Sequence, residues 1–374
     1  MTRVLIAGVS TRGLAGSAAR AGYEVVAIDG FGDLDLRVHA RTVIVARVDG
    51  RFSIPTALAA ARETRRDVTC YVASFENHPE AVEALAGACS LWGNAPDVLA
   101  RVRDPEQLAR TLAARGLPTP AVRRAVPPGN GGRRWLVKPR ASGGGSGIAS
   151  WRGERVPARS YLQERVVGIA GSVVFAADGR RAVVLGISRA LAGRPAFGAT
   201  GFKYCGSILL TPEGPLFEYA HRLAALVTAE FGLVGVNGVD FVVAHGVPFA
   251  IEVNPRYTAS MELVERAYGL SIFETHARAC AGSLPEFSVP RHDLETWGKA
   301  VVYARRGVTP VGTERWLADP DLRDVPVGGE PIAPGHPICT IFARERDPER
   351  CLVALARRAA GVYRTLERRE ARTA

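Results

Sequence analysis

Three oxygen-bearing side chains occur close together near the middle of the sequence, in two apolar stretches that each have the character of a strand. Asp240 lies in residues 235–243, and Glu252 and Asn254 lie in residues 249–254. If the stretches form neighbouring strands, the three side chains point at one spot. Carboxylate and amide oxygens bind hard cations such as Mg²⁺, which keep substrate phosphates as further ligands. The pattern therefore predicts a Mg²⁺–nucleotide site and transfer of a phosphoryl group.

Each of these residues, and the nearby Arg256, also has an ordinary structural interpretation. Asp240 alternatively caps a turn, and Glu252 alternatively forms an internal ion pair. Asn254 precedes Pro255 in a dipeptide that marks turns. Arg256 is alternatively one surface arginine among many. Four ordinary roles clustered so tightly are a poorer account of the pattern than one site.

A glycine-rich segment, residues 143–147, follows one of the few lysines in the chain. The sequence has three lysines, Lys138, Lys203 and Lys299, so 45 of its 48 basic residues are arginine. Lysine is a compact point charge, whereas arginine is a planar fork. Glycines let backbone N–H groups approach phosphates closely. Because the lysine precedes the glycines, the segment is not a Walker A loop. A flexible hairpin is the alternative to a phosphate-binding turn.

The first part of the chain alternates strands and helices. Apolar runs at residues 4–8, 23–28, 43–46 and 68–73 are typical of buried strands, and stretches of helical character lie between them. Strands separated by helices predict a parallel sheet of the Rossmann type, ending near Gly93. The turn at residues 8–13 lacks the G-x-G-x-x-G spacing of a dinucleotide fingerprint, so NAD binding is disfavoured.

Composition narrows the class of protein. A chain of 374 residues predicts two to four domains. The formal charge is +11, but no basic run is interleaved with aromatic residues, which favours anionic small-molecule substrates over nucleic acid. The six cysteines lack metal-binding spacing and indicate reduced thiols. We expect a cytoplasmic protein, because neither a signal peptide nor a membrane-spanning apolar run is recognisable.

Taken in order, the motifs resemble those of the ATP-grasp superfamily. These are Lys138 before residues 143–147, a hinge strand at residues 163–166, and Asp240 followed by residues 252–256. The resemblance covers most of the chain. It implies an α/β ATP-grasp fold, with an N-terminal Rossmann-like (pre-ATP-grasp) domain and a small α+β C-terminal domain. The expected boundaries are 1–93, 94–290 with a lid at about 120–165, and 291–374.

The resemblance also implies cofactors, ATP and Mg²⁺ with Mn²⁺ as the alternative metal, and site residues. Asp240, Glu252 and Asn254 would hold the metal, and Lys138 and Arg256 would act on the phosphoryl group. The implied nucleotide-binding residues are Lys138, Gly143, Gly144, Gly145, Ser146, Gln163, Glu164, Arg165 and Val166. Two departures stand out. Pro105 occupies the usual place of a basic nucleotide contact, with Arg101 or Arg103 as substitutes, and residues 168–171 lack the usual carboxylate for the ribose.

The implied activity is that of a carboxylate–amine ligase, which forms an acyl phosphate with ATP and releases ADP and phosphate. Residues 7–13, 29–35 and 254–263 are similar to a branch of carboligases that includes tyramine–glutamate ligases of methanofuran and methylofuran synthesis. That branch also has members linked to methanopterin-dependent one-carbon metabolism. The alternatives are a biotin-carboxylase or purine-type carboxylase that uses bicarbonate, and an ATP-binding protein without turnover.

The expected partners are a small carboxylate and an amine, at least one of them acidic, with no nucleic acid and no membrane. Homo-oligomerisation is left open. In related ligases the acceptor enters opposite the adenine, which implies a pocket between the first domain, Arg256 and residues 189–207. Its candidate residues are Ser10, Thr11, Arg12, Arg189, Lys203 and Ser260. The alternative is that Arg12 braces its own turn and Lys203 is solvent-exposed.

Overall fold

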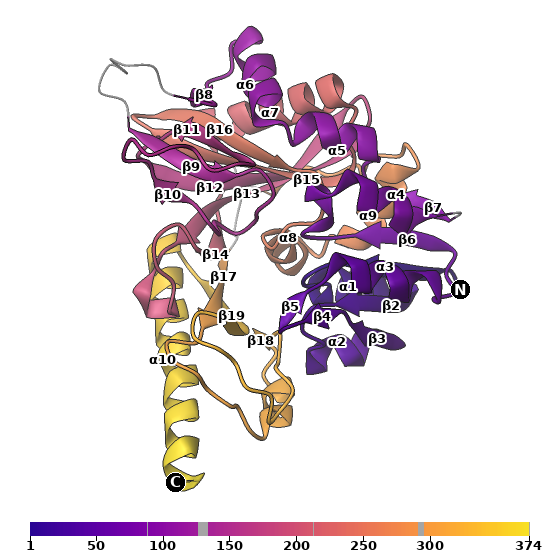
Figure 1. Cartoon of the computed structure of the whole chain (residues 1–374), viewed down its shortest axis with the longest axis vertical. Coiled ribbons are helices and arrows are strands. Elements are labelled where there is room, and N and C mark those ends of the chain that lie inside the picture. Colours follow the sequence, from indigo (N-terminus) through magenta and orange to yellow (C-terminus); the bar gives the residue numbers. More distant parts are fainter. Residues whose placement is uncertain (88, 126–133, 212, 291–294, 374) are drawn as a thin grey trace.

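The computed structural model describes residues 1–373 apart from 88, 126–133, 212 and 291–294, and the side chains of 368–373 are not described either. The predicted lid therefore includes residues 126–133, which lie outside the described part. So do residues 291–294, at the start of the predicted C-terminal domain. The described chain builds three main sheets, which Figure 1 shows from the N-terminal strands to the long C-terminal helix.

The first sheet is parallel and is flanked by helices, as the alternating sequence predicts. Its strand order is β3-β2-β1-β6-β7, with every neighbouring pair parallel. Its strands are apolar runs because both faces are covered, and Val4 to Ala7 are fully buried. The elements are β1 (Arg3–Ala7), α1 (Arg12–Arg20), β2 (Glu24–Asp29), α2 (Leu34–His39), β3 (Thr42–Val45), a hairpin of β4 (Arg47–Val48) and β5 (Arg51–Phe52), α3 (Ile54–Arg62), β6 (Val68–Tyr71), the 3₁₀ helix η1 (Phe75–Asn77), α4 (Pro79–Ala86) and β7 (Ser90–Trp92).

A small antiparallel sheet carries Lys138 and the hinge. Two helices precede it, α5 (Pro96–Val102) and α6 (Pro105–Ala114), and Asp104 caps α6 by accepting from two backbone N–H groups. The strand order is β10-β9-β11-β8, from β8 (Val122–Arg123), β9 (Trp135–Pro139), β10 (Ala149–Ser150) and β11 (Ser160–Glu164). Trp135, Val137 and Leu162 form its small core. This sheet corresponds to the predicted lid.

The largest sheet is antiparallel and runs through the rest of the molecule. Its order is β16-β15-β12-β13-β14-β17-β19-β18. Because β14 pairs with β17, the sheet continues across residue 290, and the domain boundaries stay a prediction. Its strands are β12 (Ile169–Asp178), β13 (Ala182–Ala192), β14 (Tyr204–Leu209), β15 (Val234–Ala244), β16 (Val247–Asn254), β17 (Thr296–Tyr303), β18 (Leu322–Arg323) and β19 (Pro337–Glu345).

Helices cover this sheet at several places. The 18-residue helix α7 (Gly214–Phe231) packs on β12 and β13, and α10 (Pro348–Thr373) packs on β17 and β19. The remaining helices are α8 (Met261–Tyr268), α9 (Ile272–Cys280) and the 3₁₀ helices η2 (Pro195–Phe197) and η3 (Thr313–Ala318). None of the described helices combines the length and the apolar character needed to cross a membrane.

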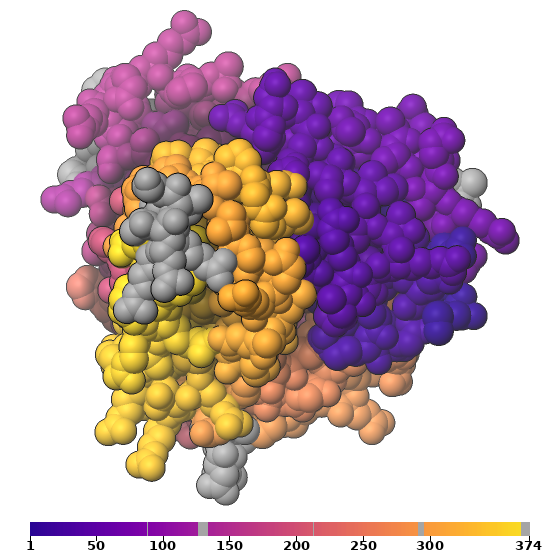
Figure 2. All heavy atoms as spheres, turned by 90° about the horizontal axis from the view of Figure 1, so that it is seen from below, coloured from indigo at the N-terminus to yellow at the C-terminus, as the bar shows by residue number. Residues whose placement is uncertain are grey.

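The parallel sheet and its helices, called the first domain below, pack firmly against the rest of the described chain. One hydrophobic cluster joins Val4 and Leu14 of the first domain to Met261 and Phe273 of α8 and α9. On another side, the Leu34 backbone N–H donates to the Val325 carbonyl oxygen at 2.8 Å. Figure 2 shows, from below, the N-terminal residues beside the orange segment that includes η3 and β18. A shared apolar core of this kind holds the first domain in a fixed position relative to the sheets.

Candidate active site

The hairpin of β15 and β16 brings the three predicted metal ligands together. Asp240 faces Glu252 directly across the two strands, and Gly238 faces Asn254. Side chains two positions apart on a strand share a face, so Glu252 and Asn254 point the same way. The Asn254 Nδ2 donates to Asp240 Oδ2 at 3.1 Å. The expected meeting of these side chains is present, although their metal role stays a prediction.

The two carboxylates have different proton affinities. Burial raises the pKa of Asp240 to about 7, and the neighbouring Glu252 charge adds to the increase. Burial acts in the same direction on Glu252, but attraction from Lys138, Arg103 and Arg256 leaves its pKa lowered. Two carboxylates side by side repel when both are ionised.

A divalent cation would remove this repulsion, and two carboxylates with one amide oxygen are a donor set that suits Mg²⁺. Clusters of three or more His, Cys, Asp or Glu that could hold a metal do not occur within the described residues. A metal here would thus depend on phosphate or water for its other ligands.

Lys138 lies opposite these carboxylates on β9. Its Nζ donates to Gln163 Oε1 at 3.1 Å and lies 6.0 Å from the centre of the Tyr161 ring. Burial lowers the pKa of Lys138, but the charges of Glu252 and Tyr161 outweigh burial and leave it raised. The lysine is therefore a permanent cation at neutral pH. A pocket between the lid and β16 has Lys138, Gly143, Gly145, Tyr161 and Glu252 on its walls.

Arg103 also lines this pocket, beside Pro105. Its Nη1 donates to the Val253 carbonyl oxygen at 2.9 Å and lies 3.6 Å from Glu252 Oε2. Arg101 instead donates to the Phe231 carbonyl oxygen. Of the two arginines that the sequence offered as substitutes at Pro105, the structure puts Arg103 at the pocket. Sequence spacing could not separate them, because both stand near the start of α6.

The glycine segment packs against the loop before β14. Gly144, Gly145 and Gly147 have φ angles of 61°, 79° and 72°, which favour glycine. A Cβ on Gly145 would lie 1.9 Å from the Phe202 carbonyl oxygen, and the Tyr204 N–H donates to the Gly144 carbonyl oxygen at 2.9 Å. Ser146 is exposed. The glycine segment, at the tip of the lid, is thus held against residues 202–204 by backbone contacts.

The hinge residues divide between internal contacts and exposure. Gln163 is buried between Lys138 and the Ile251 carbonyl oxygen, to which its Nε2 donates at 3.2 Å. The Glu164 N–H donates to the Ala121 carbonyl oxygen at 2.8 Å. Arg165 is exposed, with its guanidinium 6.0 Å from the centre of the Phe202 ring, and Val166 is half-buried. Their role in binding adenine stays a prediction.

Arg256 lies between the metal residues and the first domain. Its Nε donates to Glu76 Oε1 at 2.6 Å, its Nη1 to the Tyr257 carbonyl oxygen at 2.9 Å, and its Nη2 to Asn254 Oδ1 at 3.2 Å. Its side chain is 11% exposed, so it is not a surface arginine. Glu76 was not among the residues that the sequence singled out, since nothing in its spacing connects it with the metal strands.

The predicted substrate residues are used in internal contacts at several different places. Thr11 donates to Asp29 Oδ2 through its N–H (2.6 Å) and hydroxyl (2.8 Å), and Ser10 is exposed. Arg189 forms an ion pair with Glu349. Lys203 Nζ donates to the Gly335 carbonyl oxygen at 2.6 Å, and Ser260 is buried beside Thr258.

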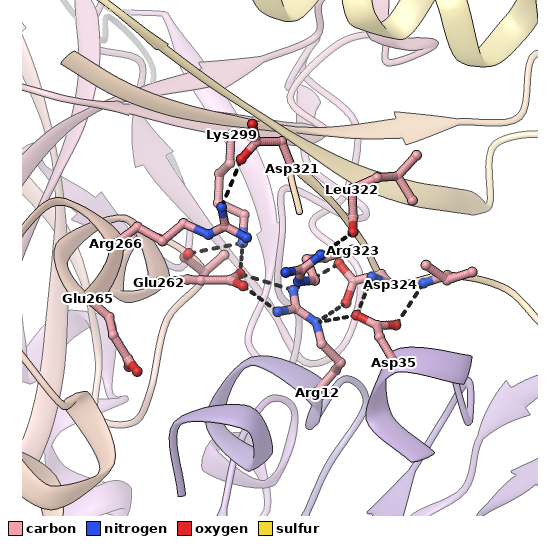
Figure 3. Close-up of polar contacts among 12 residues, drawn as sticks. Arg12, Asp35, Glu262, Glu265, Arg266, Lys299, Asp321, Leu322, Arg323 and Asp324 are labelled. Atoms are coloured by element: carbon pink, nitrogen blue, oxygen red, sulfur yellow. Dashed lines mark hydrogen bonds and ion pairs between the residues drawn. The ribbon is translucent and has the colours of Figure 1, made fainter. Parts of the chain in front are cut away.

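Arg12 lies at the centre of a buried ion-pair cluster (Figure 3). It bonds both carboxylate oxygens of Glu262 and both of Asp324, through four hydrogen bonds. Lys299 Nζ donates to Glu262 Oε2 at 2.8 Å, and Asp35 lies 3.5 Å from Arg12 Nε. Burial lowers the pKa of Arg12, but Asp324 and Glu262 hold it well above its ordinary value.

Arg12 therefore braces the junction between the first domain, α8 and the loop after β18, rather than only its own turn. Four of its five N–H groups are engaged. Its predicted role in binding an acidic substrate stays a prediction. Sequence reasoning missed Glu262 and Asp324 as partners of Arg12, because they lie 250 and 312 residues further along the chain. Lys299 was noticed for the scarcity of lysine, without a role.

Part of the chain matches a known protein family. Residues 102–260 match the family model of an ATP-grasp domain. The matched segment is less than half of the 374 residues, and it includes Lys138, Asp240, Glu252, Asn254 and Arg256. Among curated proteins, the formate-dependent phosphoribosylglycinamide formyltransferase of Anaeromyxobacter dehalogenans (strain 2CP-C) is 33% identical over 150 residues. That match spans 38% of this chain and 38% of the relative, so the chain aligns with well under half of that protein's length.

Solved structures extend the likeness to nearly the whole chain. The biotin carboxylase domain of Hydrogenobacter thermophilus 2-oxoglutarate carboxylase, solved with MgADP and bicarbonate, has a TM-score of 0.71 at 15% identity and covers 92% of this chain and 86% of its own. N5-carboxyaminoimidazole ribonucleotide synthetase from Thermotoga maritima has a TM-score of 0.67 at 19% identity, over 96% and 98%. L-amino acid ligase from Bacillus licheniformis has a TM-score of 0.68 at 16% identity, over 96% and 97%. The predicted α/β ATP-grasp fold is confirmed.

Proposed function

We propose that the protein is an ADP-forming ligase that phosphorylates a carboxylate with Mg–ATP and joins the product to an amine. The observation that carries this proposal is the grouping of Asp240, Glu252 and Asn254 on one face of the hairpin, opposite Lys138. Phosphoryl transfer needs positioning and charge neutralisation more than covalent chemistry. Oxygen ligands and permanent cations around one pocket supply both.

The basic residues of the site have distinct positions. Lys138 enters from the lid, Arg103 from the segment before α6, and Arg256 from the turn after β16. Such fixed cations stabilise the charge that develops on a transferring phosphoryl group. Bound Mg²⁺, held by the carboxylates and Asn254, would neutralise charge on the nucleotide phosphates. The pocket would thus take the phosphate end of ATP.

The chemistry then follows in two steps. A carboxylate oxygen of the substrate attacks the γ-phosphorus, the bond to ADP breaks, and an acyl phosphate forms. The amine nitrogen attacks the acyl carbon, phosphate leaves, and the amine loses a proton to complete the amide. The lid must exclude water between the two steps, since water would hydrolyse the acyl phosphate. The packing of Gly144 and Gly145 against residues 202–204 supports this role.

A carboxylase that uses bicarbonate is the second candidate. It is favoured by the fold likeness to a biotin carboxylase domain solved with bicarbonate and to N5-carboxyaminoimidazole ribonucleotide synthetase. The carboxylate–amine reaction is favoured by the likeness to an L-amino acid ligase and by the curated relative, whose name gives formate, a carboxylate, as its requirement. The two candidates share the phosphorylation step and differ in the acceptor.

The narrower proposal places the protein in the synthesis of a one-carbon carrier coenzyme. It rests on the similarity of residues 7–13, 29–35 and 254–263 to the carboligase branch with tyramine–glutamate ligases. The relatives described above do not include such a ligase, so glutamate ligation remains a proposal about the substrate.

The test is ADP release by the 374-residue chain with Mg–ATP under three conditions: bicarbonate alone, L-glutamate with a panel of amines, and no acceptor. Amine-dependent ADP release with an amide product supports the ligase. Release that depends on bicarbonate alone supports the carboxylase. Binding of Mg–ADP by calorimetry without any turnover would contradict both and leave an ATP-binding protein.

A further inference from the structure

One corner of the first domain reaches into the candidate site. The corner consists of Tyr71, at the end of β6, and η1, which follows it. The Tyr71 hydroxyl donates to two carbonyl oxygens, that of Pro255 at 3.2 Å and that of Asn94 at 3.0 Å. The Asn94 Nδ2 also donates to the Pro255 carbonyl oxygen, at 3.0 Å. The turn that carries Arg256 is therefore fixed from the first domain at its backbone.

Glu76 of η1 fixes the side chain of Arg256. The pair is almost fully enclosed, with Glu76 1% exposed, and joins residues 180 positions apart in sequence. Glu76 accepts a hydrogen bond from Nε of Arg256, while Tyr257 and Asn254 each accept one from an Nη nitrogen. An arginine has five N–H donors. Among the described residues, one N–H on each Nη nitrogen thus remains for a ligand.

Asn77, the next residue, holds the second arginine. Its Oδ1 accepts from Arg103 Nη2 at 2.8 Å, and Arg103 Nη1 faces Glu252. The Nδ2 of Asn77 donates to the Ser142 carbonyl oxygen of the lid at 3.4 Å. Two adjacent residues of the first domain therefore contact both arginines of the site and the lid, which a fold-bracing contact alone does not require.

We propose that Glu76 and Asn77 are positioning residues for phosphoryl transfer, with Glu76 orienting Arg256 and Asn77 orienting Arg103. The inference rests on the proposed function and adds to it a role for the first domain in the phosphorylation step. Fixing a guanidinium before the reaction removes the cost of ordering it in the transition state. Binding Nε to Glu76 turns the Nη edge of Arg256 toward Asn254, the predicted metal ligand.

The carboxylate of Glu76 has a further property that favours this role over a simple brace. Its Oε2 is buried and finds no hydrogen-bond partner among the described residues. A brace that only held two domains together would be expected to use both oxygens, as Glu262 does with Arg12. The one-oxygen contact through Nε leaves the Nη groups outside the ion pair.

The experiment is a double-mutant cycle on phosphate release from Mg–ATP by the 374-residue chain. We expect Glu76→Ala to lower kcat about tenfold to hundredfold, the range for losing a charged hydrogen bond, and to leave the KM for ATP and the Kd for Mg–ADP within about threefold. In the Arg256→Ala background the same change should add less than about twofold, since Glu76 acts through Arg256. Multiplicative losses would overturn the inference, as would an unchanged kcat.

Two comparisons separate this role from stability and from the proposed function. Glu76→Gln keeps an acceptor for Nε and should recover most of kcat. Glu76→Leu fills the buried space without an acceptor for Nε, and it replaces Glu76→Ala in the cycle if that variant does not fold. Glu80→Gln, an exposed carboxylate on the following helix, should match wild type. A wild-type chain that neither binds Mg–ADP nor hydrolyses ATP would overturn the proposed function and this inference together. An active wild type with a multiplicative cycle overturns this inference alone.

Discussion

Two clusters of charged side chains in this protein have similar composition, but they differ in how completely their hydrogen bonds and ion pairs are formed. In the first cluster, Arg12 is hydrogen-bonded to Glu262 and Asp324, and Lys299 is hydrogen-bonded to Glu262. Around Glu252, the bonds are incomplete: Asp240 has a raised pKa, and Glu252 is 32% exposed and lies 3.6 Å from its nearest basic group. The first cluster has little capacity left for a ligand, whereas the second cluster still has such capacity. This difference is the one expected between charges that stabilise the fold and charges of a ligand site.

The cluster around Arg12 should therefore be measured by stability. Arg12→Met keeps the apolar stem and leaves Glu262, Asp324 and Asp35 short of one cation. We expect the free energy of unfolding in urea to fall by about 3–5 kcal/mol, the cost of removing one partner of a buried pair. ATP turnover of the folded variant should stay within a few-fold of wild type. A large loss of turnover at unchanged stability would break the comparison and return Arg12 to substrate binding.

The matched control is Arg189→Met, which removes an ion pair with Glu349, a side chain that is 72% exposed. Exposed pairs contribute about 0–1 kcal/mol. A loss as large as that of Arg12→Met would show that burial is not the reason for the difference.

The cluster around Glu252 should be measured by turnover. Glu252→Gln removes the charge that would hold the metal and that faces Lys138 and Arg103. We expect turnover of ATP to fall at least about 100-fold, because a metal that carries transition-state charge is lost. The free energy of unfolding should change by less than about 1 kcal/mol, since repulsion between Asp240 and Glu252 is relieved at the same time. Near-normal turnover would refute the metal assignment.

Acid should weaken the Arg12 cluster, because the pKa of Glu262 sets the direction in which stability changes with pH. Burial raises its pKa, but Arg12 and Lys299 hold it well below the ordinary value of about 4.3. A folded pKa below the unfolded one means that the stabilisation is complete above pH ~4.3 and is lost as the pH falls through the folded pKa. We expect the difference in unfolding free energy between wild type and Glu262→Gln to shrink by on the order of 2 kcal/mol between pH 5 and pH 3. A constant difference would contradict the ion pair.

The smallest expected effect lies in the lid. Gly145→Ala would put a Cβ 1.9 Å from the Phe202 carbonyl oxygen, at a φ of 79° that disfavours alanine, so the lid tip must shift. We expect ATP turnover to fall about tenfold with little change in stability, which is less than the ~100-fold that a 1 Å misplacement of reacting groups can cost. Gly143→Ala is the control, since its Cβ would meet no described atom within 4 Å. Equal effects of the two substitutions would show that packing against residue 202 is unimportant.

Much of the fold and part of the candidate site could be predicted without coordinates. The parallel first sheet follows from buried apolar runs separated by helices, which fit few other arrangements. Asp240, Glu252 and Asn254 could be grouped because a hairpin aligns residues that are close in sequence. The placement of Lys138 opposite them needed the family pattern as well, since the lid strands pair locally but their distance from β16 is not encoded in any spacing.

The sequence by itself determined the local arrangement: the hairpin with Asp240, Glu252 and Asn254, the lysine before the glycine segment and the alternation of the first sheet. These depend on residues near one another in the chain, where backbone geometry alone sets which side chains share a face. Only the tertiary structure decided which arginines lie at the candidate site and which are bonded internally. Arg12 with Asp324, Arg256 with Glu76 and Arg103 with Asn77 join residues that are 312, 180 and 26 positions apart. The sequence positions of charged residues do not indicate which residues they pair with, so the partners are set by packing between distant parts of the chain.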